Sequence, residues 1–125
     1  MSRTDSLGQF EQLILSAIVA LGDKAYGVTI QEKVERLSDG KPVSPGAVYV
    51  TLDRLEDKGL VRSWLADPTP ERGGRRKRYY QVLAAGERAL TESLKAALRM
   101  VDAVEETLSG IQLPGRKRWK PIRQG

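Results

Sequence analysis

Positively charged side chains are concentrated in two short segments of this 125-residue chain. The formal net charge is +5, and residues 72–78 and 116–123 each carry five cations and no anion. Subtracting these ten charges leaves the rest of the chain with a net charge of −5. Because Arg and Lys pair well with phosphate oxygens, such local clusters favour docking on an anionic partner over a general solubilising role. The first cluster consists of Arg72, Arg75, Arg76, Lys77 and Arg78.

A second set of residues suited to recognition lies on a helix predicted at residues 44–58. Ser44 can accept a hydrogen bond from a free backbone N–H at the helix start, and Pro45 suits the first helical position. Gly59 can adopt the left-handed conformation that ends a helix. Apolar residues repeat at helical spacing between these ends and predict a core-facing side. They are Val48, Leu52 and Leu55.

The opposite face of this helix has few long charged side chains. Its residues are Gly46, Ala47, Val50 and Arg54. A DNA major groove accepts one α-helix, offering thymine methyl groups to small apolar side chains and guanine edges to Arg. Acidic residues at 53, 56 and 57 leave only the N-terminal half of the helix suited to a groove. A capped amphipathic helix is also common in proteins that never contact DNA, so this helix alone does not establish a function.

The composition argues against an enzyme. The chain has no Cys and no His, which removes disulfides, thiolate metal sites and the commonest general base. The pair Gly73-Gly74 lacks the spacing of a phosphate-binding glycine motif. No run approaches the roughly 18 apolar residues of a membrane span, and the N-terminus lacks the apolar core of a signal peptide. We therefore expect a cytoplasmic protein that has no catalytic activity, cofactor, metal or membrane partner.

Two further helices are predicted before the helix at residues 44–58. Apolar spacing places them at about residues 7–21 and 26–37. In the second of these, Leu37 is expected to face inward together with Ile30 and Val34. A turn-rich break at residues 38–42 separates it from the next helix, which is the order of a helix-turn-helix.

A β-hairpin is predicted after Gly59. Residues 61–66 and 75–83 contain strand-forming side chains, and the loop between them is rich in Pro and Gly. Trp64 is expected to pack in the base of this hairpin. The cations of the first cluster lie near its tip, where they can neutralise DNA phosphates. Taken alone, the same tip could equally be a solvated charged turn.

The region from Gly86 to about Leu108 predicts a long helix with a coiled-coil seam. Its apolar residues alternate in spacing by four and three. They are Leu90, Leu94, Ala97, Val101, Val104 and Leu108. The three helices and the hairpin that precede it are too small to cover all of these apolar residues, so we expect a homodimer. The alternative is a helix that packs on its own domain. The basic tail at 110–125 is expected to lack fixed structure, as an arm on DNA or a solvated segment.

Three motifs resemble the PadR-like transcriptional regulators. They are Leu13-Ile14-Leu15 with Tyr26-Gly27, the stretch from Ala47 to Val61, and Arg78-Tyr79-Tyr80-Gln81-Val82-Leu83 with Gly86. The resemblance covers residues 7–108. It implies a winged helix-turn-helix head, a dimer formed through the C-terminal helix, and repressor-type binding to a palindromic operator in double-stranded DNA. The single C-terminal helix resembles the short branch of that family.

The resemblance also implies roles for individual residues. The groove-entering end would contain Ser44, Gly46, Ala47 and Val50, and Arg54 would reach a phosphate or a guanine. The Tyr49 hydroxyl is expected either to contact a phosphate or to pack between this helix and the hairpin. The wing would place Arg72, Arg75, Arg76, Lys77 and Arg78 on phosphates, whereas Tyr79 and Tyr80 are expected to be structural.

Two departures from the family pattern limit these implications. Ala84-Ala85 stands where the family commonly has a Thr that caps the final helix, so the start of that helix is not defined by the motif. Residues 90–108 contain no aromatic side chain, so the sequence does not support the aromatic drug site of one family branch. Whether a small-molecule effector exists is left open, because no residue set identifies a ligand.

The sequence thus predicts a mainly α protein with a small β-hairpin. Its expected parts are a winged helix-turn-helix DNA-binding domain at 7–83, a dimerisation helix at 84–109 and a basic flexible tail at 110–125. The recognition helix is 44–58 and the wing is 67–78. The expected function is that of a sequence-specific transcriptional regulator, a dimeric repressor. The alternative is a helical dimer that serves as a protein-interaction module and binds DNA only nonspecifically.

Overall fold

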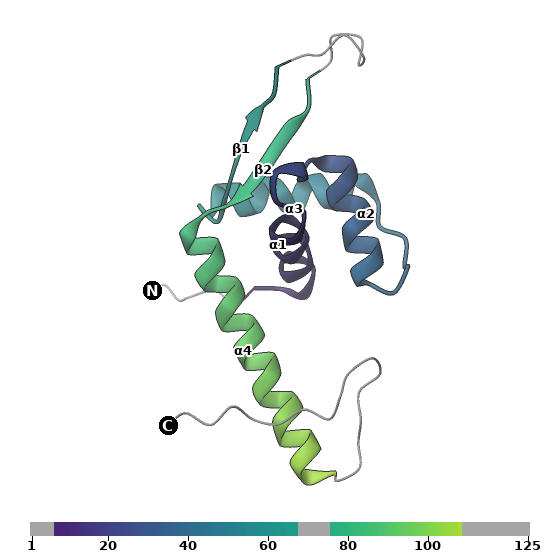
Figure 1. Cartoon of the computed structure of the whole chain (residues 1–125), viewed down its shortest axis with the longest axis vertical. Coiled ribbons are helices and arrows are strands. Elements are labelled where there is room, and N and C mark those ends of the chain that lie inside the picture. Colours follow the sequence, from purple (N-terminus) through teal and green to yellow (C-terminus); the bar gives the residue numbers. More distant parts are fainter. Residues whose placement is uncertain (1–6, 68–75, 109–125) are drawn as a thin grey trace. The chain divides into compact units, whose positions relative to one another are not determined.

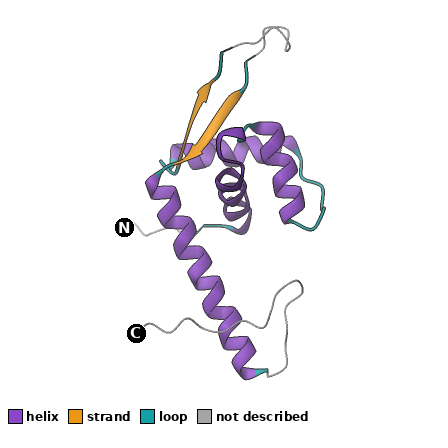
Figure 2. Cartoon of the chain, in the orientation of Figure 1, coloured by secondary structure: helices purple, strands orange, loops and turns teal. Residues whose placement is uncertain are grey.

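The computed structural model describes residues 7–67 and 76–108 (Figure 1). Of these, residues 7–67 and 76–90 belong to one compact unit, and residues 91–108 belong to a second. The elements in chain order are α1 (Gln9–Leu21), the short 3-10 helix η1 (Gly22–Lys24), α2 (Gly27–Leu37), α3 (Pro45–Asp57), β1 (Val61–Leu65), β2 (Arg78–Val82) and α4 (Ala84–Thr107). Figure 2 shows the helices and the two-stranded hairpin. The predicted class, mainly helical with one hairpin and a long C-terminal helix, is confirmed.

Local hydrogen bonds define where the first two helices begin. The Gly8 N–H donates to the Glu11 carboxylate over 3.0 Å at the start of α1. At the start of α2, the Tyr26 N–H donates to the Thr29 hydroxyl over 3.0 Å. Each bond satisfies a backbone donor that the helix itself leaves unpaired. Both helices therefore begin within about two residues of the positions that their apolar spacing predicts.

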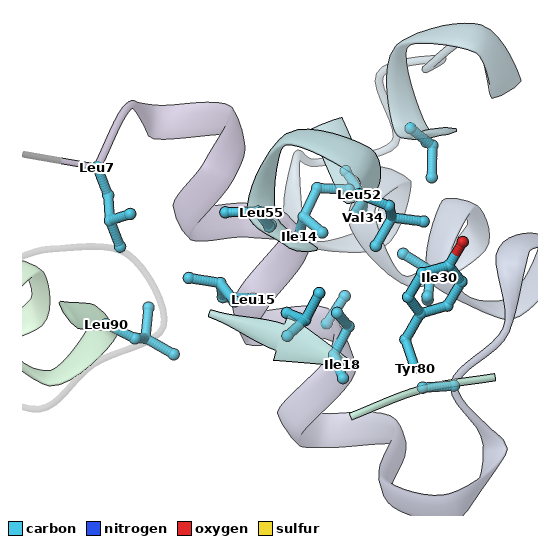
Figure 3. Packing of buried hydrophobic residues seen from close by; sticks show 14 residues of the cluster. Leu7, Ile14, Leu15, Ile18, Ile30, Val34, Leu52, Leu55, Tyr80 and Leu90 are labelled. Carbon is cyan, nitrogen blue, oxygen red and sulfur yellow. The ribbon is translucent and has the colours of Figure 1, made fainter. Parts of the chain in front are cut away.

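The core lies where α1, α2 and α3 meet the hairpin (Figure 3). Its fully buried large side chains are Ile14, Leu15, Ile30, Leu52, Leu55, Val34, Val48 and Val61. The prediction that Leu37 faces this core is wrong, because its side chain is 46% exposed. Leu37 is the last residue of α2. We attribute its exposure to that position at the end of the helix, past the neighbouring elements that cover Ile30 and Val34.

The connection between α2 and α3 is a tight turn with two left-handed residues. Asp39 has a φ of 61° and Gly40 a φ of 81°. The Gly40 N–H donates to the Glu35 carbonyl oxygen over 2.7 Å. At the far end of α3, Gly59 has a φ of 76°, and the Leu60 N–H donates to the Leu55 carbonyl oxygen over 2.9 Å. This is the glycine-terminated helix end that the sequence predicts.

The two strands pair antiparallel, from Val61 opposite Val82 to Leu65 opposite Arg78. β2 is shorter than the predicted strand at 75–83, although the Ala66 N–H still donates to the Lys77 carbonyl oxygen over 2.8 Å. Trp64 lies opposite Tyr79, toward the tip of the hairpin. The prediction that it packs in the base is therefore wrong, because the register places it three residues beyond the first pair.

The start of α4 is packed tightly against the head. A Cβ added to Gly86 would overlap the Leu60 carbonyl oxygen and lie 2.8 Å from Cγ1 of Val82. One turn later, Leu90 is only 7% exposed and belongs to the same buried cluster as Leu7; both are labelled in Figure 3. Leu90 is therefore part of its own domain's core, although the heptad pattern placed it in the seam for a partner.

Candidate nucleic-acid interface

Helix α3 separates a buried face from an exposed one. The Ser44 hydroxyl accepts a hydrogen bond from the Ala47 N–H over 3.1 Å, which caps the helix. The side chain of Val50 is 56% exposed, and Gly46, Ala47 and Arg54 are exposed as well. The buried side consists of Val48, Thr51, Leu52 and Leu55. The predicted division of this helix is confirmed, so its N-terminal half presents small side chains to the outside.

The outward face changes character toward the end of α3. Asp53 and Asp57 are exposed there, and both carry negative charge at neutral pH. Carboxylates repel DNA phosphates, so this half of the helix is poorly suited to lie on a DNA backbone. The part of α3 that can approach an anionic partner closely is therefore its first two turns.

Tyr49 covers the first residue of α2. A Cβ added to Gly27 would overlap the Tyr49 hydroxyl oxygen and lie 2.6 Å from its ring carbon Cζ. The tyrosine ring thus occupies the space that a side chain at position 27 would need. About half of Tyr49 stays exposed. This packing is against α2, whereas the sequence suggested packing against the hairpin as the alternative to a phosphate contact. The motif Tyr26-Gly27 did not by itself indicate this role for Gly27.

The hairpin is attached to the head through its tyrosines. Tyr80 is buried, and its N–H donates to the Ala25 carbonyl oxygen over 3.0 Å. Burial raises the pKa of Tyr80 to about 12, with Asp53 and Glu56 adding to the shift and Arg78 opposing it. This phenol therefore stays protonated at neutral pH.

Tyr79 provides a second attachment. Its ring packs edge-on against Tyr26, with 5.3 Å between the ring centroids. It also stacks with Trp64, with 6.2 Å between the ring centroids. Arg62 lies over the Trp64 ring at 4.6 Å. The prediction that Tyr79 and Tyr80 are structural is supported by these contacts, and they join the base of α2 to both strands.

Two cations predicted to lie on the wing have partners within the domain. The Lys77 ammonium lies 3.5 Å from the centroid of the Tyr26 ring. Arg78 donates to the Ser63 hydroxyl over 3.0 Å, and that hydroxyl donates to the Glu56 carboxylate at 2.9 Å and 3.0 Å. Lys77 therefore contacts the residue before α2, whereas Arg78 joins the two strands through Ser63, which is itself bonded to α3.

The remaining cations of the cluster differ from these two. Arg76 is exposed, and no hydrogen bond or ion pair of its side chain is found within residues 7–67 and 76–108. Arg72, Arg75 and the basic tail lie outside the described residues. Arg76 is therefore the described wing cation whose charge is most available to an external anion.

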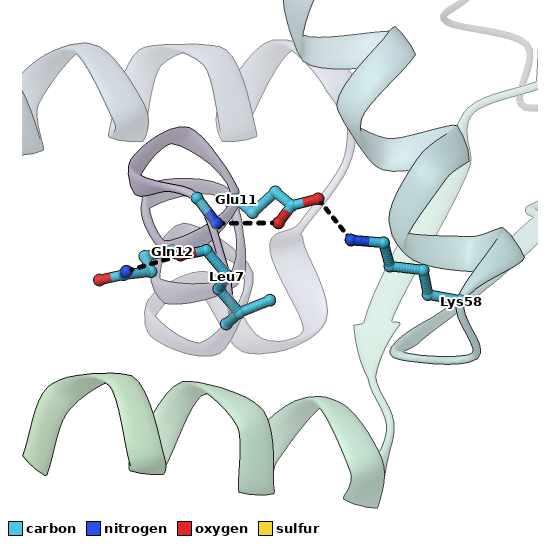
Figure 4. Close-up of polar contacts among 5 residues, drawn as sticks. Leu7, Glu11, Gln12 and Lys58 are labelled. Atoms are coloured by element: carbon cyan, nitrogen blue, oxygen red, sulfur yellow. Dashed lines mark hydrogen bonds and ion pairs between the residues drawn. The ribbon is translucent and has the colours of Figure 1, made fainter. Parts of the chain in front are cut away.

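An ion pair joins the start of α1 to the end of α3 (Figure 4). The Lys58 ammonium lies 3.0 Å from Glu11, whose side chain is largely buried. Burial by itself raises the pKa of this carboxyl. The hydrogen bond from Gly8, the bond and charge of Lys58 and the charge of Arg54 outweigh that effect, so the pKa is lowered overall. Glu11 is therefore ionised at neutral pH and fixes the C-terminal end of α3.

Helix α4 presents apolar side chains to solvent. Met100 is 65% exposed, and Leu94, Leu98 and Val104 are exposed too, as is Leu108 directly after the helix. Ala97 and Val101 are partly buried. Exposed apolar side chains repeated along one helix are typical of an association surface.

No cluster of three or more acidic side chains suited to a metal ion occurs in the described ranges. Within the same ranges, no helix combines the length and hydrophobicity needed to cross a membrane.

Three helices followed by a two-stranded hairpin, with the third helix capped and exposed beside the hairpin, define a winged helix-turn-helix protein. The sequence model of the transcriptional regulator PadR-like family matches residues 14–92. The chain belongs to this family of transcriptional regulators.

Individual relatives agree with this assignment. A transcriptional regulator of Mycobacterium tuberculosis is 34% identical over 91 residues, which are 73% of this chain and 77% of the relative. The solved structure of a PadR family transcription regulator from Clostridium difficile has a TM-score of 0.61 and 26% identity, covering 82% of this chain and 100% of that one. A PadR-like regulator from Bacillus cereus has a TM-score of 0.64 at 24% identity, covering 82% and 93%, and so supports the fold alone.

Proposed function

We propose that this regulator is a homodimeric repressor that inserts the N-terminal half of α3 from each subunit into the major groove of a palindromic operator. The observation that carries the proposal is the exposed face of α3, where Gly46, Ala47 and Val50 face outward. Small side chains allow the helix backbone to approach base edges closely, and Val50 suits a thymine methyl group.

The flanking residues contribute phosphate contacts in this proposal. Ser44 caps α3, and Tyr49 is a half-exposed residue of its first turns whose hydroxyl lies over Gly27 of α2. In this proposal both residues contact the DNA backbone. Arg54 reaches a phosphate or a guanine edge. On the wing, Arg76 contacts a phosphate together with Arg72 and Arg75, because its charge has no partner in the described part of the domain. Lys77 and Arg78 contribute mainly by holding the wing in place.

Self-association through α4 completes the proposal. Exposed apolar residues such as Leu94 and Val104 lie at heptad spacing with Ala97 and Val101, so a second copy of the same helix would bury them. A twofold dimer presents two α3 helices to DNA and therefore matches a palindrome whose half-sites are about 34–36 Å apart. Occupying promoter DNA in this way excludes RNA polymerase and represses transcription.

A binding titration tests the proposal directly. Fluorescence anisotropy would compare the duplex upstream of the protein's own gene with a scrambled duplex of equal length, at several salt concentrations. We expect a preference of roughly 10³ or more for one duplex, with an affinity that falls steeply as salt rises. Footprinting of the preferred duplex should then show two symmetric half-sites.

Equal, weak binding to both duplexes would count against this assignment of the operator. If a genomic fragment library also yielded no preferred duplex, the alternative function would be favoured, in which the α4 surface serves as a protein-interaction module and DNA binding is nonspecific. The exposed apolar residues of α4 are the observation that supports this second candidate.

A further inference from the structure

Val43, the residue immediately before the cap of α3, is bound on both backbone polar groups by side chains of α2. Its N–H donates to the Glu35 carboxylate over 2.9 Å. Its carbonyl oxygen accepts a hydrogen bond from the Gln31 side-chain amide over 2.8 Å. Gln31 and Glu35 are four residues apart, so they lie on one face of α2, one turn from each other. We refer to these two bonds as the Val43 anchor.

The position of Val43 determines where α3 begins. Its side chain packs against the buried core, which adds a third contact to the two bonds of the Val43 anchor. The next residue, Ser44, caps α3, and the one after it, Pro45, has a restricted φ. Little backbone freedom therefore separates Val43 from the first turn of α3, and a shift of Val43 would move that turn with it.

Glu35 holds the linker between the two helices at two places. Its backbone carbonyl accepts the hydrogen bond from Gly40, and its carboxylate accepts the one from Val43. The carboxylate is negatively charged at neutral pH, in a domain proposed to approach phosphates. By Coulomb's law alone its charge weakens DNA binding. Its hydrogen bond to Val43 has the opposite effect and strengthens DNA binding if it holds the first turn of α3 in the geometry that enters the groove.

We infer that Glu35 and Gln31 are positioning residues that place the first turn of α3 for entry into the groove. The inference rests on the proposed function. Apparent affinity falls in proportion to the fraction of molecules in the binding-competent arrangement. If loss of the Val43 anchor lowers that fraction to about a tenth, the preferred duplex is bound about tenfold more weakly. Loss of a negative charge without any positioning role would instead tighten binding to every duplex.

Four variants of the full-length chain separate these effects. Glu35→Ala removes the bond and the charge, whereas Glu35→Gln removes the charge and keeps an oxygen acceptor for the Val43 N–H. Gln31→Ala removes the second bond and leaves the charge unchanged, and it serves as the second test if Glu35→Ala does not fold. The matched control is Glu32→Ala, because Glu32 is an exposed acid on the same helix whose side chain makes no hydrogen bond or ion pair in the described ranges.

Two measurements are made on each variant. Hydrogen exchange of the Val43 amide, followed by NMR, reports on the Val43 anchor in the absence of DNA. Anisotropy titration with the preferred and scrambled duplexes gives the ratio of their Kd values. We expect Glu35→Ala to accelerate exchange and to lower the ratio about tenfold, Gln31→Ala to lower it to a lesser extent, and Glu35→Gln to restore both values. Glu32→Ala should leave exchange and ratio unchanged.

The outcomes distinguish this inference from the proposed function. If the wild-type protein prefers one duplex but Glu35→Ala and Gln31→Ala keep the full ratio, the positioning role is wrong and the proposed function stands. If Glu35→Ala and Glu32→Ala both tighten binding equally, only charge is at work and the inference is again overturned. If the wild-type protein prefers no duplex, the proposed function fails, and with it the role of the Val43 anchor in DNA binding.

Discussion

The hydroxyl group of Tyr49 lies directly over Gly27, so that a side chain on Gly27 would occupy the same space. Tyr49 belongs to α3 and Gly27 is the first residue of α2. The contact therefore joins the two helices of the helix-turn-helix at the end where α2 begins. The tyrosine is about half exposed, so its ring packs on α2 and also reaches the surface beside α3.

Gly27→Ala is expected to destabilise the domain by about 1–3 kcal/mol, as overpacking typically does. Alanine has the better helix propensity, so a loss of stability would come from the overlap with Tyr49. The measurement is the free energy of unfolding in urea. Gly46→Ala is the matched control, because a Cβ placed there has no atom within 4 Å beyond its chain neighbours and the backbone of its own helix.

A double-mutant cycle checks the cause of that loss. Tyr49→Ala removes the ring that the new methyl group would overlap. In the Tyr49→Ala background, Gly27→Ala should therefore lower the free energy of unfolding much less. Additive effects of the two substitutions would show that the packing of Tyr49 on Gly27 is not the source of the destabilisation.

The wing cations should affect DNA binding through charge rather than sequence. Arg75→Ala combined with Arg76→Ala is expected to weaken binding to all duplexes by a similar factor. The slope of log affinity against log salt should flatten by about 0.9 for each phosphate that the wing no longer neutralises. Titrations at four salt concentrations measure this slope. Arg88→Ala, an exposed cation on α4, is the control, and an unchanged slope in the wing variant would contradict the wing assignment.

Substitutions on the exposed face of α3 should instead change base preference. Val50→Ala removes the side chain proposed to lie on a thymine methyl group, and a mismatch at one base pair typically costs about 1–3 kcal/mol. Kd values for a set of duplexes, each with one base pair changed, would locate that position. Arg54→Ala is tested in the same set, and a uniform shift across all duplexes would assign Arg54 to a phosphate. A uniform shift with Val50→Ala would remove Val50 from the base-reading residues.

The Glu11–Lys58 pair should make stability depend on pH. The folded protein lowers the pKa of Glu11 below its ordinary value of 4.5. The ionised Glu11 therefore contributes fully to the free energy of unfolding at pH values above 4.5. The contribution is lost as pH falls through the lower folded pKa. Glu11→Gln is therefore expected to cost about 1–3 kcal/mol at pH 7, and the difference from wild type should shrink in acid. Urea unfolding across this pH range measures it.

The control for this pH dependence is Glu32→Gln, which removes an exposed acid without a partner in the described ranges. It should leave stability nearly unchanged at every pH. A difference between Glu11→Gln and wild type that stayed constant down to strongly acid pH would show that ionisation of Glu11 is not its source.

Self-association should depend on the heptad positions of α4. Leu94→Glu combined with Val104→Glu places charges where a second helix would pack, and the dimer should dissociate. Sedimentation equilibrium measures the change in mass. Met100→Glu is a demanding control, because Met100 is more exposed than either residue but lies outside the heptad seam. Dissociation by Met100→Glu, with no effect of the seam variant, would place the interface on a different face of α4.

Much of this fold could be predicted from local patterns. The cap at Ser44, the left-handed Gly59 and the buried series Val48, Leu52 and Leu55 were all expected from residues within a few positions of one another. Such features depend on hydrogen bonds and periodicity inside one helix, so they are present wherever that helix forms. Leu37 and Leu90 show the limit of this reasoning. Periodicity predicts which residues lie together on one face of a helix. Which part of the protein covers that face depends on how the neighbouring elements pack.

The partners of individual charged and aromatic side chains were decided only by tertiary structure. Glu11 and Lys58 are 47 residues apart in the chain, and nothing in either segment identifies the other. Lys77 and Arg78 are neighbouring cations in one basic run. Lys77 lies over the ring of Tyr26, whereas Arg78 donates a hydrogen bond to Ser63. The physical reason is that side chains meet across elements only after the whole core has packed. The sequence by itself therefore determined the helices, the hairpin and the family, whereas the folded domain determined which cations stay available for DNA.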